Sequence, residues 1–172
     1  MTWRRALAYW ACFLALGAYY LLVLREPSRP APAHLTRAPF LSLAEPEIEA
    51  LELRRGATVI RCRRVAGRWQ VVEPAGAAVP SDLVTALVAN LTQLPEVEVV
   101  DEGGGDLTQF GLAPPVSQMI LTMTGAPTIT VRLGSRNPSG TAVYAQRNDV
   151  PRVFLIGLNV RYYEDLVFQG LA

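Results

Sequence analysis

The chain has 172 residues, of which 16 are basic and 15 acidic, so its formal net charge is only +1. A balance this close to neutral excludes a global electrostatic field that would recruit nucleic acid. The two cysteines, Cys12 and Cys62, lie in different segments and are not expected to pair, so core packing alone must hold the folded part together.

An apolar run without a charged residue spans 6–24 and is preceded by Arg4 and Arg5. At ~1.5 Å per residue, a helix of this length is roughly 28 Å long, about the hydrocarbon thickness of a bilayer. Basic residues at the leading end favour its retention in the cytoplasm. We therefore expect a cytoplasmic tail over 1–5, a single transmembrane helix over 6–24 in the bacterial inner membrane, and a periplasmic C-terminal domain. The alternative is a cleaved signal peptide, but its small-residue cleavage site would come too late after the apolar run.

One face of this expected helix carries small residues, because Ala8, Ala11, Ala15 and Ala18 recur at a spacing of three, four and three. Small residues let two backbones approach closely, and helix association in lipid depends on such packing. The pattern predicts an interface with another membrane helix. The alternative is that alanine is simply frequent in this chain.

Residues 25–46 are rich in proline and charge and show no apolar periodicity. Proline-rich chain is semi-extended, at ~3.1 Å per residue where it adopts polyproline II, so this segment is expected to be a stalk. Phe40 and Leu41 near its end indicate packing on the domain, and the single histidine, His34, is expected to be solvated. The extracytoplasmic domain is expected over 47–172.

Short alternating segments between 48 and 72 predict two or three strands joined by tight turns. They contain the strongest basic cluster of the chain, which includes Arg54, Arg55, Arg61 and Arg63. Such a cluster would face anionic lipid headgroups or an acidic partner. The alternative is a solvated strand face that nearby glutamates balance.

Leucines at helical spacing between Ser81 and Pro95 predict one long amphipathic helix with Ser81 as its N-cap. Its leucine stripe is expected to pack on a sheet. The carboxylates of the following DEGGGD segment suggest calcium, but their spacing lacks the alternating ligand pattern of a calcium loop. No metal site is therefore expected there.

Four strand-like segments separated by turns lie between 117 and 157, and three consecutive hairpins favour an antiparallel sheet. A short helix is expected over 159–168, with Tyr162 and Tyr163 covering the sheet. The fold class is therefore α+β: an N-terminal transmembrane helix, then a mostly antiparallel sheet with one long amphipathic helix and a short C-terminal helix.

The side chains that catalysis commonly requires are scarce. The chain has no lysine and one histidine, which excludes Ser-His-Asp, Cys-His and Schiff-base arrangements. It has no GxxxxGK[ST] or HExxH motif and no cysteine pair for zinc. Cys62 is expected to be a buried, inert thiol. We therefore expect a noncatalytic protein without cofactors; a hydrolase, the alternative, would need strongly perturbed carboxylates in a cleft.

The order of landmarks in the domain resembles the domain-of-unknown-function 4340 family over about Leu51 to Leu166. The residues that carry the resemblance are Trp69, Pro74, Ser81, Asp82, Phe110, Gly111, Leu112, Leu133, Gly134, Pro138, Gly140, Tyr144, Val153 and Phe154. The resemblance implies a membrane-anchored envelope protein that is encoded beside a gliding-motility-type ABC transporter. It transfers no catalytic residue.

The expected function is therefore that of a noncatalytic accessory or assembly subunit of a bacterial cell-envelope membrane complex, an ABC-transporter system. The expected partners are the membrane subunits of that complex and the lipid bilayer. Besides the basic cluster, the expected contact residues lie in a turn: Ser135, Arg136 and Asn137. The alternative function is an extracytoplasmic module that presents a glycan, lipid or peptide to a transporter, which predicts a concave apolar patch with convergent polar groups.

Overall fold

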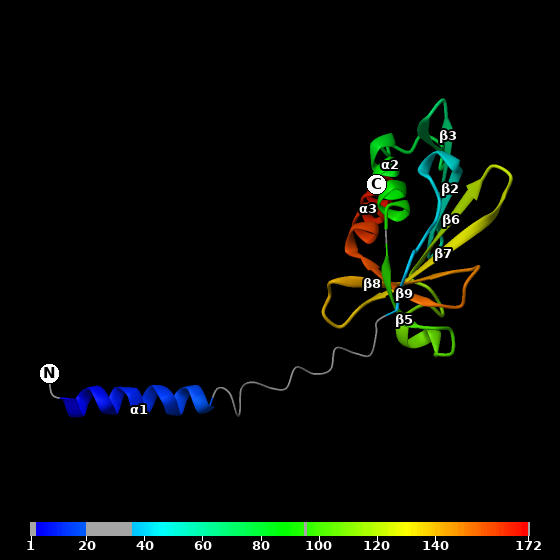
Figure 1. Cartoon of the computed structure of the whole chain (residues 1–172). Helices are drawn as coiled ribbons and strands as arrows, with labels where there is room; N and C mark the ends of the chain where they lie inside the picture. The colour runs from blue at the N-terminus through cyan, green and yellow to red at the C-terminus, as the bar shows by residue number, and fades with distance from the viewer. Residues whose placement is uncertain (1–2, 20–35, 95, 172) are drawn as a thin grey trace. The chain divides into compact units, whose positions relative to one another are not determined.

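The computed structural model describes residues 3–19, 36–94 and 96–171 (Figure 1). The chain divides into two compact units, Met1–Leu35 and Thr36–Ala172. The second unit begins before residue 47, so the end of the expected stalk forms part of the folded domain. His34 and the rest of the stalk before residue 36 lie outside the described residues.

The first unit contains the helix α1 (Trp3–Tyr19), which is 17 residues long and includes Arg4 and Arg5. Among the described residues, no helix is both long enough and apolar enough to cross a membrane. At ~1.5 Å per residue, the described part of α1 that follows the arginines, residues 6–19, accounts for about 21 Å of a hydrocarbon core of about 30 Å. This finding contradicts the expected single-pass transmembrane helix over 6–24, whose last five residues lie outside the described part. The expected inner-membrane location with a cytoplasmic N-terminus depended on that helix and is therefore not supported.

The second unit is built on one antiparallel sheet, whose nine described strands follow the order β1-β5-β9-β8-β7-β6-β2-β3-β4. The strands are β1 (Arg37–Ala38), β2 (Ile48–Arg55), β3 (Thr58–Val65), β4 (Arg68–Glu73), β5 (Val97–Asp101), β6 (Ser117–Met123), β7 (Ala126–Arg136), β8 (Ala142–Arg147) and β9 (Val153–Gly157). The short 3-10 turns are η2 (Glu45–Glu47) and η3 (Leu107–Phe110). Three pairs of neighbours are not consecutive in the sequence: β1 with β5, β5 with β9 and, at the centre of the sheet, β2 with β6.

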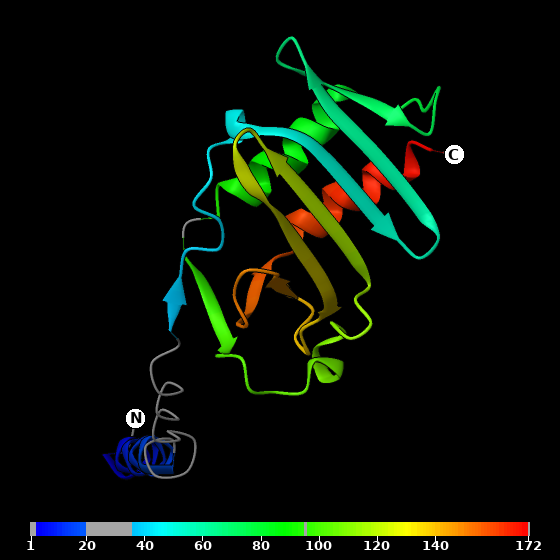
Figure 2. The same cartoon turned by 90° about the vertical axis from the view of Figure 1, so that its right-hand side faces the viewer.

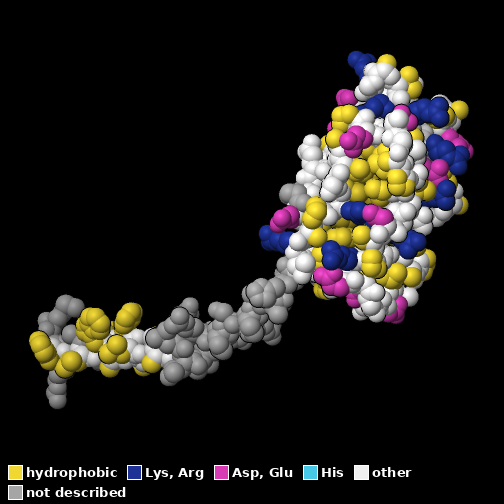
Figure 3. Space-filling model, turned by 45° about the vertical axis from the view of Figure 1, so that its right-hand side comes forward, with side chains coloured by type: hydrophobic (Ala, Val, Ile, Leu, Met, Phe, Trp, Pro, Cys, Tyr) yellow, Lys and Arg dark blue, Asp and Glu magenta, His cyan; other side chains and the backbone are white. Residues whose placement is uncertain are grey.

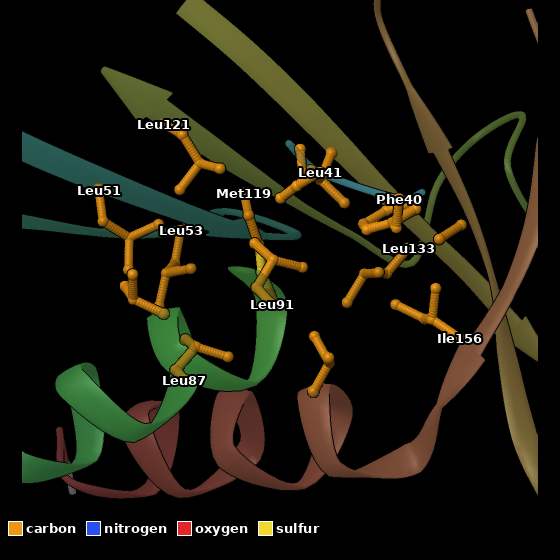
Figure 4. Close-up of a cluster of buried hydrophobic side chains, with 14 of the residues drawn as sticks. Phe40, Leu41, Leu51, Leu53, Leu87, Leu91, Met119, Leu121, Leu133 and Ile156 are labelled. Atoms are coloured by element: carbon orange, nitrogen blue, oxygen red, sulfur yellow. The ribbon is translucent and has the colours of Figure 1, made fainter. Parts of the chain in front are cut away.

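Two helices, α2 (Ser81–Thr92) and α3 (Leu158–Gln169), cover one face of this sheet (Figure 2). Each has 12 residues. The C-terminal helix α3 was expected to be shorter than α2, but the two are equally long. In the core, Leu87 and Leu91 of α2 point toward Leu51, Leu53 and Met119 of the sheet (Figure 4). Alternation along the strands and leucine spacing along α2 explain this packing, because each puts its apolar side chains on one face.

Ser81 does not cap α2, since Pro80 occupies the N-cap position. The Ser81 hydroxyl instead accepts a hydrogen bond of 3.1 Å from the backbone N–H of Trp69, whose indole is buried in the core. The bond uses a donor that the edge strand β4 would otherwise leave unpaired. Ser81 therefore ties the start of α2 to the edge of the sheet.

The loop before β2 closes the other end of the core. Phe40 is fully buried and meets Phe154 of β9 edge-on, with 5.3 Å between the ring centroids. Leu41 is buried beside it. These apolar contacts explain why the folded unit begins near Thr36.

The face of the sheet opposite the helices is called the outer face below. Segment 102–116, which includes η3, packs over part of it: Phe110 meets Tyr144 of β8 with ring centroids 5.0 Å apart. Leu112 is buried, and the backbone carbonyl of Phe110 lies directly over Gly134 of β7. The outer face therefore has a covered part over β7 and β8 and an exposed part over β2, β3 and β4.

Candidate functional site

The exposed part of the outer face carries three of the arginines predicted as contact residues. Arg54, Arg61 and Arg63 alternate with buried apolar residues of β2 and β3, which puts their side chains on the outer face. Figure 3 shows one face of the domain, on which apolar side chains gather and basic and acidic side chains lie interspersed around them. The structure thus brings these three arginines together on adjacent strands.

Most of this positive charge is balanced within the sheet. Glu52 lies opposite Arg61, which lies opposite Glu73 on the next strand. Arg61 donates to Glu52 at 2.9 Å and pairs with Glu73, while Arg54 pairs with Glu52 from the same strand. Burial raises the pKa of Glu52, but hydrogen bonds from Arg61 and Arg54 outweigh it and hold this pKa below its ordinary value. The two arginines, Arg54 and Arg61, are therefore balanced by the two glutamates.

Arg63 differs from its neighbours. Among the described residues, its guanidinium has no hydrogen-bond or ion-pair partner, and it is exposed. It borders a shallow hollow of about 200 Å³ on β2, β3 and β4, with Arg61 on the same rim. Ala50 and Val72 contribute apolar lining, and Val72 is 59 % exposed. This feature, called the β3–β4 hollow below, combines exposed apolar surface with one uncompensated cation.

Arg55 points to the other face. Its Nη2 lies 3.0 Å from Glu164 Oε2 and 2.7 Å from Asp165 Oδ1 of α3, and its guanidinium stacks over the Phe168 ring at 4.4 Å. Strand alternation explains the separation, because neighbouring residues of β2 face opposite sides of the sheet. The structure therefore places Arg55 against α3, away from the other three arginines.

Sequence reasoning missed the charged cluster beneath α3. Glu164 is fully buried, and Arg161 Nη1 donates to it at 3.0 Å and to Ser117 Oγ at 3.1 Å. Arg161 Nη2 also donates to the carbonyl of Gly134 at 3.1 Å. The helix turns Glu164 inward where Tyr162 was expected, and the Tyr162 side chain is 58 % exposed. The signal in the sequence was the three-residue spacing of Arg161 and Glu164, which allows a pair on one helix face.

The predicted contact turn between β7 and β8 uses most of its polar groups internally. Asn137 Oδ1 accepts from the N–H groups of Thr141 and Ala142 at 2.9 and 3.0 Å. Ser135 Oγ donates to the carbonyl of Phe110 at 3.1 Å, while Arg136 is exposed. Because β6 and β2 separate β7 from β3, the fold does not join this turn to the arginines of β3.

The alanine stripe lies in α1, where Ala11, Ala15 and Ala18 are exposed; Ala8 belongs to the same helix. Its predicted role as a membrane-helix interface presupposed the transmembrane span that the structure contradicts.

The acidic DEGGGD segment is organised around its own backbone. Asp101 Oδ1 accepts the N–H groups of Gly103, Gly104 and Gly105 at 2.6, 3.0 and 3.3 Å, and these bonds hold the pKa of Asp101 below its ordinary value. Glu102 pairs with Arg152 at 2.7 Å. Within the described residues, no group of three or more ligating side chains could hold a metal ion.

The thiol of Cys62 in β3 faces the core. Burial raises the pKa of its thiol to about 11. The thiol is therefore protonated at neutral pH, whereas nucleophilic chemistry needs the thiolate.

Comparison with known proteins supports one family. Residues 69–167 match the family described as Domain of unknown function (DUF4340), and this match covers more than half of the chain. A search of curated proteins and a search of solved structures found no match. The matched segment holds β4 to β9, α2 and most of α3, and it confirms the family that the sequence landmarks indicated. This chain therefore belongs to the DUF4340 family.

Proposed function

We propose that this protein is a noncatalytic accessory or assembly subunit of a bacterial cell-envelope complex, an ABC-transporter system, and that its folded unit binds a protein partner. The single observation that carries the proposal is the β3–β4 hollow, where Arg63 and the exposed Val72 lie side by side on an uncovered sheet face. The transporter as partner rests on the family resemblance.

The chemistry of the hollow fits a protein contact. Interface residues that carry much of the binding energy are enriched in arginine and lie in well-packed pockets, surrounded by contacts that exclude water. Glu52 and Glu73 occupy Arg61, so Arg63 is the cation available to an acidic partner group, while Val72 offers apolar area. A partner segment with an acidic side chain next to an apolar one would complement both.

Affinity purification from the native cells tests the proposal. The tagged full-length protein would be cross-linked in intact cells, and the captured proteins identified by mass spectrometry. We expect recovery of transporter permease and ATPase subunits, and their loss from the Val72→Glu variant. Because Val72 is already exposed, this substitution removes little core packing.

The matched control is Val116→Glu, since Val116 is also an exposed valine, 44 % accessible, but lies outside the β3–β4 hollow. It should retain the partners. A second variant, Arg63→Glu, should also lose them, because it opposes an acidic partner group with like charge. Retention of every partner by both hollow variants, or recovery of no transporter subunit by the unaltered protein, would contradict the proposal.

A further inference from the structure

A second hollow, separate from the β3–β4 hollow, lies where β7 and β8 meet the loop that leads to β9. It has a volume of about 330 Å³, and Arg132, Gln146, Asn148 and Asp149 contribute its polar lining. Small-molecule sites begin at about this volume. It is open to solvent, and several polar side chains line it.

Arg132 of β7 is the cation of this hollow. It lies opposite Gln146 of β8, and its Nη1 donates to Gln146 Oε1 at 3.3 Å. Among the described residues, this is its one hydrogen-bond partner, and no carboxylate lies within 4.0 Å to form an ion pair with it. Most donors of its guanidinium therefore remain available.

Gln146 and Asn148 are themselves fixed by hydrogen bonds to the backbone around Arg132. Gln146 is only 6 % exposed, and its Nε2 donates to the carbonyl of Pro151 at 3.0 Å, which turns its Oε1 toward Arg132. Asn148 Oδ1 accepts the N–H of Thr130 at 2.8 Å, which ties the start of the β8–β9 loop to β7. Gln146 thus receives one donor of the guanidinium, and the other donors remain available to a ligand.

The second arginine of the hollow, Arg147, uses its donors within the protein. Arg147 Nε donates to Asp149 Oδ1 at 2.8 Å, its Nη2 pairs with Asp149 Oδ2, and its Nη1 donates to the carbonyl of Phe40. The hydrogen bonds from Arg147 hold the pKa of Asp149 below its ordinary value, so Asp149 is ionised and already paired at neutral pH. The positive charge that the hollow offers to a ligand is therefore that of Arg132.

We propose that this hollow binds the oxyanion group of a small ligand, a carboxylate or a phosphate, and that Arg132 recognises it. A guanidinium presents its donors as a planar fork that matches both groups bidentately. The proposal goes beyond the accessory-subunit function and does not rest on it, since it uses different residues on different strands.

Titration of the ¹⁵N-labelled full-length protein tests the site. The probes are inorganic phosphate and succinate, added at constant ionic strength with chloride as the balancing anion. We expect at least one of them to cause saturable shifts in the amide signals of 130–132 and 146–151. Saturation by phosphate alone assigns a phosphate ligand and saturation by succinate alone a carboxylate ligand; either result supports the site.

Arg132→Gln removes the charge, and we expect it to weaken binding about tenfold or more. Arg132→Lys keeps the charge but loses the planar fork, so it should bind more weakly than the unaltered protein and more tightly than Arg132→Gln. Since the lysine variant retains a cation on the sheet, it keeps the test valid if the glutamine variant fails to fold.

The matched control is Arg63→Gln, which removes another uncompensated guanidinium from the same outer face but outside this hollow. It should bind as the unaltered protein does. Equal weakening by the two glutamine variants would show a general charge effect and overturn the proposal. Shifts that do not saturate with either probe would also overturn it.

Discussion

Gly134 is a residue at which the backbone of the covering segment 102–116 approaches the sheet closely. A Cβ atom placed there would lie 2.1 Å from the backbone carbonyl oxygen of Phe110 and 3.1 Å from Leu112 Cγ. The first of these neighbours is backbone and cannot rotate away. Glycine is therefore required at this position for close approach rather than for a turn.

We predict that Gly134→Ala lowers the free energy of unfolding by about 1–3 kcal/mol, the usual cost of overpacking. Urea unfolding followed by circular dichroism measures it. Gly104→Ala is the control, because a Cβ there meets nothing within 4 Å and Gly104 does not need a positive φ. Equal midpoints for the two variants would show that segment 102–116 moves aside at no cost.

Asp101 gives a prediction about pH. Its folded-state pKa is lowered, chiefly by the hydrogen bond from the Gly103 N–H, so the unfolded chain binds the proton more tightly than the folded chain. The stabilisation is present above the unfolded pKa, near 3.8, and is lost as the pH falls through the folded pKa. In Asp101→Asn this contribution is absent, so the free energy of unfolding should fall less steeply below pH 4. Chemical denaturation between about pH 2 and 6 tests this; identical pH profiles would refute it.

Sequence reasoning did not find the roles of these two residues: Gly134 was expected to permit a tight turn but lies inside β7, and Asp101 was expected in a loop but ends β5. The DEGGGD segment was considered only as a calcium site, whereas the N–H groups of its three glycines converge on one carboxylate oxygen of Asp101. Residue type alone does not show this, because the result depends on the backbone conformation of Gly103, with φ of +113°. The need for Gly134 arises from Phe110, which is far away in the sequence.

At the scale of elements, α3 is fixed to the sheet by charge as well as by apolar contacts. Glu164 is the centre of this attachment, since Arg161 of the same helix and Arg55 of β2 both pair with it at 3.0 Å. Arg161 extends the contact to Ser117 at the start of β6. Removing one member of a buried charge cluster leaves the others uncompensated, which costs more than the loss of one hydrogen bond.

We therefore predict that Glu164→Gln lowers the free energy of unfolding by about 3 kcal/mol, because Arg161 loses its anion and Arg55 keeps only the partly exposed Asp165. Asp165→Asn is the control: Asp165 also pairs with Arg55 but is 38 % exposed, so its substitution should cost at most about 1 kcal/mol. Thermal and urea unfolding measure both. A cost for Glu164→Gln no greater than that of the control would mean that the cluster does not hold α3.

Strand and helix periodicity predicted the elements of the domain but not every inward side chain. Alternation correctly separated Arg61 and Arg63 from the core face of β3. It gives no reason to bury a glutamate of α3, because that burial depends on Arg55, more than a hundred residues earlier in the chain. Ser81 was assigned as a helix cap for a similar reason: its actual donor, Trp69, belongs to another element.

At the scale of the molecule, the sequence predicted hairpins but not how they join. Segments β6 to β9 pair in chain order, as turns between them suggest. The pairing of β2 with β6 joins segments separated by α2 and β5, and no local pattern encodes it. The transmembrane prediction counted an uncharged run over 6–24, whereas no helix among the described residues is both long enough and apolar enough to cross a membrane.

The strand order also decides which part of the chain can fold alone. The family match begins at Trp69 and so omits β2 and β3, yet these strands lie between β6 and β4 in the sheet. Without them β4 has no neighbouring strand, and the core loses Leu51, Leu53 and Ile60. The family match is therefore shorter than the folding unit, which runs over 36–172.

We predict that a fragment of residues 36–172 unfolds cooperatively, with a midpoint close to that of the full chain, because the buried residues of the core cluster all lie within it. A fragment of 69–167 should show no cooperative transition and few dispersed amide signals. Scanning calorimetry and amide proton spectra of both fragments test this. A cooperative transition in the shorter fragment would contradict this prediction. It would mean that β5 to β9 and the two helices bury enough apolar surface on their own and that β2 and β3 are not needed for folding.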